Sequence, residues 1–222
     1  MEKNYENLDI DFPDDGIARI TMNRPERLNA LTYGLVEDLH TALDFVDSQH
    51  EIRALIITGA GRGFCAGLDL TGFGKIPGTE DFGEQQQGMA VQQYIAELVH
   101  HMRDTRQPII AAINGAAAGG GFAIACASDI RYCGASAKFG TAFVRLGISG
   151  CDIGVSWMLP RLIGASRAWE LMLTGRVIDS DEANRIGLVS NVTADEDLAS
   201  TCLAVAREIT RNSPFGVWMT KE

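Results

Sequence analysis

Three consecutive glycines, Gly119, Gly120 and Gly121, stand between a strand-like apolar run and a helix-like one. Glycine loses more conformational entropy on folding than any other residue, so a triplet in this apolar setting indicates that something must approach the backbone itself. If a helix begins at Gly120 or Gly121, its first N–H groups have no acceptor inside the helix and carry the positive end of its dipole. The triplet therefore predicts a site where bare backbone amides meet a negatively charged group.

A second glycine-rich loop follows a predicted buried strand over 54–58. It runs from Gly59 to Leu70 as Gly-Ala-Gly-Arg-Gly-Phe-Cys-Ala-Gly-Leu-Asp-Leu. The Gly-x-Gly-x-x-Gly fingerprint of dinucleotide-binding proteins would need glycine where Phe64 stands, and no Gly-Lys-Ser/Thr sequence occurs in the chain. Neither dinucleotide binding nor P-loop phosphate chemistry is supported.

The hydrophobic pattern alternates strands and helices, which is typical of stacked units in an α/β domain. Thr32 is a favourable N-cap for a helix that ends near residue 47. We expect a hairpin over 8–12 and 17–22 and further strands over 54–58, 109–113 and 130–133. Further helices are expected over 86–103, from the glycines to 126, and over 155–163, 167–173, 181–186 and 198–211. Segment 72–88, rich in glycine and acidic residues, is expected to be a mobile loop over the site.

Composition narrows the class of protein. A chain of 222 residues with 46% hydrophobic and 22% charged residues is ordinary for one α/β domain with a sizeable core. Its net charge of −10 argues against a nucleic-acid-binding surface, which needs a basic face. A few cationic side chains close together could still bind a polyanionic ligand. The five cysteines are scattered without Cys-x-x-Cys spacing and indicate neither a disulfide framework nor a metal site.

The apolar stretch 109–127 is about as long as the roughly 20 residues that a membrane helix requires. Its high Ala and Gly content, the polar Asn114 and the preceding Pro108 argue against a membrane span. The acidic, polar start of the chain has no features of a secretory signal. We therefore expect a cytoplasmic protein.

Two motifs together resemble the enoyl-CoA hydratase/isomerase, or crotonase, family: Phe64-Cys-Ala-Gly-Leu-Asp-Leu70 and Ala112-Ile-Asn-Gly-Ala-Ala-Ala-Gly-Gly-Gly121. The resemblance covers nearly the whole chain in the family's order, through Arg24-Pro25, Leu28-Asn-Ala-Leu31, Ser128-Asp-Ile-Arg131, Lys138-Phe-Gly140, Leu146-Gly-Ile148, Leu171-Met-Leu-Thr-Gly-Arg176 and Gly187-Leu-Val189. It implies a crotonase-like spiral of β-β-α units over residues 1–195, followed over 196–222 by the start of a C-terminal helical oligomerisation region. Family chains usually continue for several more helical turns, so the chain looks truncated. Members are typically homotrimers or hexamers.

The resemblance also implies a mechanism, because every member stabilises a thioester carbonyl as it gains negative charge. By position, the two backbone N–H donors fall on Ala66 and Gly120, and such donors are typically worth roughly 3–4 kcal/mol each. The acyl-CoA is expected along Ala66, Gly67, Leu68 and Asp69, with Asp69 more a structural loop cap than a catalyst. Arg27 is expected near the CoA phosphates, with a solvated surface arginine as the alternative. CoA enters as part of the substrate, and no cofactor or metal is implied.

The acid/base residues depart from the hydratase pattern. Classical hydratases carry glutamates at the positions of Ala123 and Phe143, so neither expected carboxylate is present. Asp152 stands at a third position, which dienoyl-CoA isomerases and aryl-CoA dehalogenases use. Its apolar neighbours, with Phe143 beside it, would desolvate the carboxylate and raise its pKa, which suits a base near neutral pH. The alternative is a helix N-cap. A second acid from 72–88 stays open.

Three functions therefore remain. A single carboxylate favours moving a proton between carbons, so the mechanism leans towards double-bond isomerisation within the enoyl-CoA hydratase/isomerase class. A hydrolase or dehalogenase that uses Asp152 is the second. A non-catalytic acyl-CoA-binding subunit is the third, because Ala123 and Phe143 are also what a site that had lost its chemistry would show.

Overall fold

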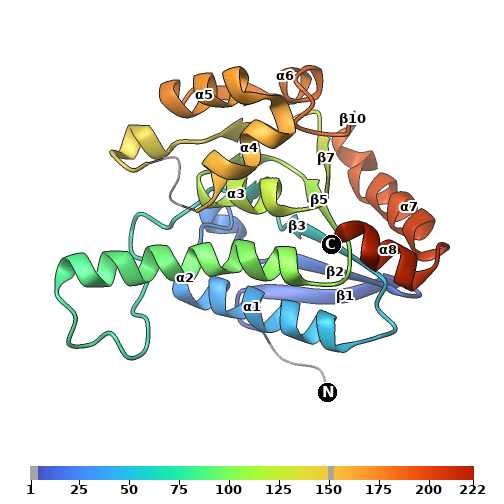
Figure 1. The fold of residues 1–222 in the computed structure, drawn as a ribbon, viewed down its shortest axis with the longest axis horizontal. Coiled ribbons are helices and arrows are strands. Elements are labelled where there is room, and N and C mark those ends of the chain that lie inside the picture. The colour runs from blue at the N-terminus through green and yellow to red at the C-terminus, as the bar shows by residue number, and fades with distance from the viewer. Residues whose placement is uncertain (1–4, 150–152) are drawn as a thin grey trace.

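The computed structural model describes residues 5–149 and 153–222, arranged around two sheets (Figure 1). The larger sheet has six strands in the order β1 (Leu8–Asp14), β2 (Ile17–Met22), β3 (Ala54–Gly59), β5 (Ile109–Ile113), β7 (Ile130–Gly134) and β10 (Asn191–Thr193). β1 and β2 form the expected antiparallel hairpin, and the other neighbouring strands pair in parallel.

The smaller sheet has four three-residue strands in the order β4 (Gly63–Cys65), β6 (Ala116–Ala118), β8 (Lys138–Gly140) and β9 (Val177–Asp179). Along the chain, β4 follows β3, β6 follows β5 and β8 follows β7. α2 (Glu84–Asp104) then follows β4, and α3 (Gly120–Ala127) follows β6. Residues 54–127 thus make two successive β-β-α turns, which confirms the expected spiral.

Both faces of the larger sheet are covered. Successive strand residues point to opposite faces, so the parallel strands present apolar side chains on each side. One face packs into the main core together with α1 (Tyr33–Ser48), α2 and α3. On the other face, Ile17, Ile56 and Ile110 pack with apolar residues of α7 (Leu198–Thr210). The larger sheet is therefore buried between two apolar clusters.

The remaining helices lie at the top and at the right of the molecule in Figure 1. α4 (Val155–Ile163), α5 (Ala165–Thr174) and α6 (Ser180–Arg185) form the upper group, and α8 (Pro214–Lys221) lies beside the main body near α7. Three short 3-10 helices, η1 (Pro25–Arg27), η2 (Phe143–Leu146) and η3 (Asp195–Asp197), complete the description.

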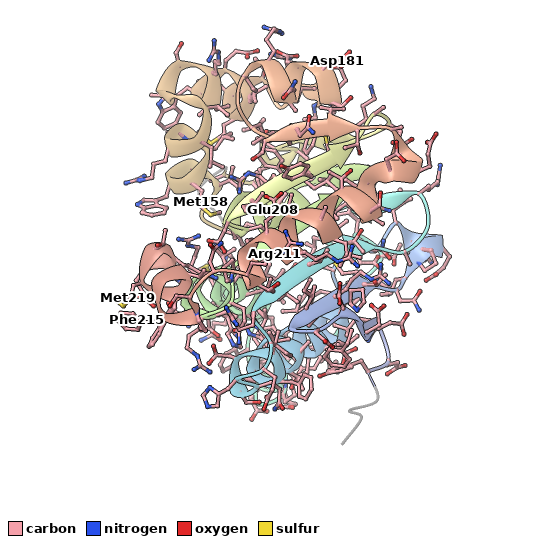
Figure 2. The ribbon with its side chains drawn as sticks, turned by 90° about the vertical axis from the view of Figure 1, so that its right-hand side faces the viewer. Met158, Asp181, Glu208, Arg211, Phe215 and Met219 are labelled. Atoms are coloured by element: carbon pink, nitrogen blue, oxygen red, sulfur yellow. The ribbon has the colours of Figure 1, made fainter. Side chains whose placement is uncertain are left out.

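α8 is tied to the body by one buried side chain. Lys221 donates from Nζ to the carbonyl oxygens of Met102 at 3.2 Å and Gln107 at 2.9 Å, and it pairs with Asp129 at 3.2 Å. Figure 2 shows Phe215 and Met219 on the outer side of the same helix, where both are largely exposed. α8 therefore has one face fixed by polar contacts and one apolar face open to solvent.

Several sequence predictions are confirmed closely. The side chain of Thr32 caps α1 by accepting from the Leu35 N–H at 3.3 Å, and the helix ends at residue 48. α4 has the predicted bounds, while α5, α6 and α7 agree within one or two residues. Ser213 caps α8, where the sequence looks like the opening of a helix.

Other expectations need correction. The helix predicted from residue 86 begins at Glu84, because Gln86 accepts from the Gly83 N–H at 3.1 Å and so fixes an earlier start. The sequence does not predict the four short strands of the smaller sheet, since three residues carry too little periodicity to distinguish a strand from a loop. Segment 72–88 is accordingly part loop, over 72–83, and part helix.

The apolar stretch 109–127 is divided among β5, β6 and α3. Within residues 5–149 and 153–222, no helix is both long and apolar enough to cross a membrane. The proposed division into 1–195 and 196–222 stays a prediction.

Candidate active site

The two glycine-rich loops touch each other through their backbones. Gly67 has a φ of +89°, and a Cβ there would lie 2.7 Å from the Ala118 oxygen and 3.1 Å from the Gly120 nitrogen. A Cβ on Gly121 would lie 2.0 Å from the Cys65 oxygen. Only glycine fits at these two positions, and its use there lets the loop after β4 lie directly on the first turn of α3.

The N–H groups of the first loop can be followed one by one. Ala66 donates to the Leu28 oxygen at 2.9 Å, and Asp69 donates to the Leu31 oxygen at 2.9 Å. Neighbouring N–H groups of an extended chain point to opposite sides, so the Leu68 N–H points away from Leu31. Within the described residues it donates to no acceptor.

The Ala66 amide is therefore already used inside the fold. The prediction that Ala66 is a free donor is wrong, and among the pocket-lining residues next to it the Leu68 N–H is open. The sequence motif gives no signal that distinguishes these two amides. In the structure, Leu68 follows Gly67, whose φ is positive, and the bridge between Leu31 and Leu68 fixes which amides of the loop face Leu31.

The second open amide is that of Gly120. It is the first residue of α3, after Gly119 with a φ of +50° as the N-cap, and the first N–H groups of a helix have no acceptor within it. Gly119 itself donates to the Gly140 oxygen at 3.0 Å, whereas the Gly120 N–H has no acceptor in the described part of the chain. The positive end of the α3 dipole adds to the field at this point.

These amides stand at a pocket of about 600 Å³. Of the predicted site residues, Ala66, Gly67, Leu68, Gly120 and Phe143 line it. The rest of its wall is mainly apolar and comes from α2, from Leu70 and from the segment around η2. Such a lining excludes water and strengthens hydrogen bonds to any charge that develops inside.

Two predicted residues lie outside this pocket. Asp69 is nearly buried and accepts from the Thr71 N–H at 3.0 Å, from the Thr71 hydroxyl at 2.6 Å and from Arg24 at 3.2 Å. The Thr71 hydrogen bonds, followed by Arg24, hold the pKa of Asp69 below its usual value. These contacts agree with its expected role as a loop cap. Arg27 is exposed on η1 and does not line the pocket.

The expected acid/base positions are apolar. Ala123 is fully buried in α3, and Phe143 lines the pocket with only 6% of its surface exposed. Asp152 lies outside the described residues. Ile153, which follows Asp152 directly, and Ile148, four residues before it, both line the pocket.

Among the described residues that line the pocket, Arg145 is the only one with a charged side chain, and none is a carboxylate. Glu80 and Glu84 line a different, smaller cavity, and Asp81 lines neither. Burial raises the pKa of Cys65 to about 12, so this thiol stays protonated at neutral pH and acts as a small apolar residue. No group of three or more His, Cys, Asp or Glu residues in the described segments is placed to hold a metal ion.

Comparisons with known proteins show which family the chain resembles. A family model described as enoyl-CoA hydratase/isomerase matches residues 13–222. A probable enoyl-CoA hydratase of Mycobacterium bovis is 40% identical over 212 residues, which cover 96% of this chain and 74% of that protein. The 1,2-epoxyphenylacetyl-CoA isomerase of Escherichia coli is 38% identical over 207 residues, which cover 93% of this chain and 78% of that protein.

Solved structures are similar over the same extent. A probable enoyl-CoA hydratase/isomerase from Mycobacterium abscessus has a TM-score of 0.91 at 39% identity, covering 97% of this chain and 80% of that one. A monofunctional enoyl CoA isomerase from M. smegmatis has a TM-score of 0.81 at 36% identity, covering 97% of this chain and 90% of that one. The sequence motifs, the spiral of β-β-α units and these relatives lead to one assignment. The chain belongs to the enoyl-CoA hydratase/isomerase family.

Proposed function

We propose that this protein isomerises the double bond of an enoyl-CoA thioester, with the Leu68 and Gly120 N–H groups binding the thioester oxygen and Asp152 moving the proton. The observation that carries the proposal is the pair of open amides at the head of an apolar pocket, on loops that touch at Gly67. A carbonyl oxygen between them would receive two hydrogen bonds that strengthen as it becomes an enolate oxygen.

The chemistry follows from this placement. A base removes a proton from one carbon next to the double bond, the electrons move onto the thioester oxygen, and the proton returns at the other end of the allylic system. Each fixed amide donor stabilises such a transition state by roughly 3–4 kcal/mol, and the α3 dipole acts in the same direction. One carboxylate is enough, because the same group takes up and returns the proton.

Hydration is less well supported by the lining of the pocket. Adding water needs a group that activates the water molecule, and the two positions where hydratases carry glutamate hold Ala123 and Phe143. Most of the similar proteins are named enoyl-CoA hydratases, and one solved structure is named a monofunctional enoyl CoA isomerase, so both reactions occur among the names of its relatives.

The binding of CoA and the assembly of subunits also belong to this proposal. The acyl group enters the pocket, and Arg27 on the exposed η1 helix meets the CoA phosphates. We expect a homotrimer or hexamer. Large exposed apolar side chains on α4 and α5, Trp157, Trp169 and Leu173, support an assembly through that end of the molecule.

The test compares Asp152→Asn with Asp104→Asn, which changes an exposed carboxylate at the end of α2. A 3-enoyl-CoA is supplied in deuterated water, and the conjugated product and the deuterium incorporated are measured together. We expect Asp152→Asn to lower both by roughly 10²-fold or more while thioester binding persists, with no such loss in the control. Exchange that continues unchanged in Asp152→Asn would remove Asp152 from the mechanism.

The same experiment separates the alternatives. Loss of the thioester, or a covalent adduct on Asp152 with an aryl-CoA, would identify a hydrolase or dehalogenase. Binding of thioesters without any proton exchange in the unmodified protein would identify a non-catalytic acyl-CoA-binding subunit.

A further inference from the structure

Next to the acyl pocket lies a second cavity of about 250 Å³. The two share part of their lining, Gly88 and Val91 of α2. The second cavity is closed on its other side by the loop that precedes α2, through residues such as Lys75 and Thr79. Two cavities with a common wall on one helix can form one continuous path for a ligand.

The spacing along α2 places both cavities along one face of this helix. The acyl pocket uses Gly88, Val91, Gln92 and Ile95, and the second cavity uses Glu84, Gln87, Gly88 and Val91. Both sets follow the i, i+3, i+4, i+7 pattern of one helix face, shifted by one turn. The wall opposite α2 also continues from one cavity to the next: Leu68 and Leu70 line the acyl pocket, and the chain from Gly74 onward lines the second cavity.

Gly88 stands at the junction of the two cavities. Gly88 is exposed, and a Cβ at this position would meet no atom within 4 Å, so no neighbouring atom fills the space in front of this residue. From Glu84 to Ile95 the stripe covers twelve residues, and the eleven steps between them span about 16.5 Å at the rise of an α-helix. This length is on the scale of an extended medium-chain acyl group.

The chemistry of the lining changes along this path. The first cavity is mainly apolar, whereas the second contains the polar side chains of Lys75, Thr79, Glu80, Glu84 and Gln87. The loop that precedes α2 and lines the second cavity is held by hydrogen bonds within itself. Thr79 donates from its hydroxyl to the Ile76 oxygen at 2.7 Å, and Glu80 accepts from the Gly78 N–H at 3.1 Å.

We infer that the second cavity receives the distal end of the acyl chain, and that the preferred substrates are medium-chain acyl-CoA thioesters with a hydroxyl group at that end. This inference rests on the proposed function, because it takes the first cavity as the acyl site. A hydroxyl group both donates and accepts hydrogen bonds, so it matches a lining that offers an ammonium group together with carboxylates. A terminal carboxylate only accepts, and it would meet both Glu80 and Glu84.

The test measures binding of saturated thioesters by calorimetry, so it does not depend on turnover. The ligands are butanoyl-CoA, dodecanoyl-CoA, its ω-hydroxy derivative and its ω-carboxy derivative. The variants are Gly88→Leu, which places a leucine side chain where the two cavities meet, and Gln85→Leu, which places leucine at an exposed position of α2 that lines neither cavity.

In the unmodified protein and in Gln85→Leu, we expect dodecanoyl-CoA to bind at least tenfold more tightly than butanoyl-CoA. The ω-hydroxy derivative should bind at least as tightly as dodecanoyl-CoA, and the ω-carboxy derivative more weakly. In Gly88→Leu, the preference for the long chain should fall below about threefold, because added methylenes gain affinity only where they are buried.

The opposite results would overturn the inference. An ω-hydroxy derivative that binds more weakly than dodecanoyl-CoA would show that the hydroxyl group is buried without partners, and an ω-carboxy derivative that binds as tightly would show that the carboxylates do not exclude an anion. A long-chain preference that survives in Gly88→Leu would show that the chain takes another route. Failure of butanoyl-CoA itself to bind, in the unmodified protein, would instead count against the proposed function.

Discussion

The substitution Gly67→Ala perturbs the proposed oxyanion site most directly. A methyl group there would lie 2.7 Å from the Ala118 oxygen and 3.1 Å from the Gly120 nitrogen. Both neighbours are backbone atoms of the second loop, so no side-chain rotation relieves the contact. Reaching even 3.0 Å from the oxygen requires the two loops to separate by about 0.3 Å, since 3.0 minus 2.7 is 0.3, and this moves the Leu68 and Gly120 amides apart.

The methyl group of Gly67→Ala is expected to cause a large loss of kcat. A misplaced reacting group can cost about 10²-fold in rate, and loss of one oxyanion donor costs roughly 10²–10³-fold in kcat. We therefore expect kcat for isomerisation to fall by about 10²–10³-fold. The affinity for the thioester should change much less, because the amides act mainly on the charge of the transition state.

Gly187→Ala is the matched control. Gly187 has a φ of +79°, close to the +89° of Gly67, and a Cβ there would meet nothing within 4 Å. Both substitutions carry the same left-handed backbone strain, about 1–2 kcal/mol, and only Gly67→Ala presses on the site. Steady-state kinetics and urea unfolding are measured for both variants. Equal kcat values in the two variants, at similar stability, would refute the reasoning.

Two further predictions concern stability. Burial, the largest cause, lowers the pKa of His40, which faces the imidazole of His101 with an Nδ1 to Nδ1 distance of 2.9 Å, so the folded state favours the neutral ring. As the pH falls, the unfolded chain binds the proton first, so the free energy of unfolding should fall as the pH drops from the ordinary pKa of 6.5 towards the lowered value. In His40→Phe this part of the pH dependence, measured by urea unfolding, should vanish. A free energy of unfolding that depends on pH as before in His40→Phe would contradict the assignment to His40. The side chain of Lys221 is only 5% exposed. Replacing Lys221 by Met removes its hydrogen bonds to two carbonyl groups and its ion pair with Asp129, and should lower the free energy of unfolding by about 2 kcal/mol. A loss below about 0.5 kcal/mol, the size expected for an ordinary surface substitution, would show that Lys221 does not fix α8.

The sequence predicts those elements whose cause is local. Thr32 caps α1 because a hydroxyl group three residues ahead of Leu35 satisfies a helix-end donor, and this rule depends on nothing else in the fold. The long strands are predictable because buried parallel strands read as continuous apolar runs. The three-residue strands are not, since their pairing is set by neighbours far away in the chain, as with β8 and β9.

The site is predictable to the level of the loop but not of the individual amide. Whether Ala66 or Leu68 is open depends on the Leu28 and Leu31 carbonyl groups, which come from another segment. The same limit applies to Lys221 and to the pair of His40 and His101, because each partner lies far away in sequence. Motifs identify which backbone is special, and the tertiary hydrogen bonds decide which atoms remain free.

The central claim is that Leu68 and Gly120 hold the thioester oxygen. A crystal structure with a bound, unreactive acyl-CoA measures it directly. The account predicts the carbonyl oxygen about 2.7–3.1 Å from both the Leu68 and the Gly120 nitrogen, with the Ala66 N–H still bound to the Leu28 oxygen. A carbonyl oxygen held by other groups, or by the Ala66 amide after it has left Leu28, would contradict it.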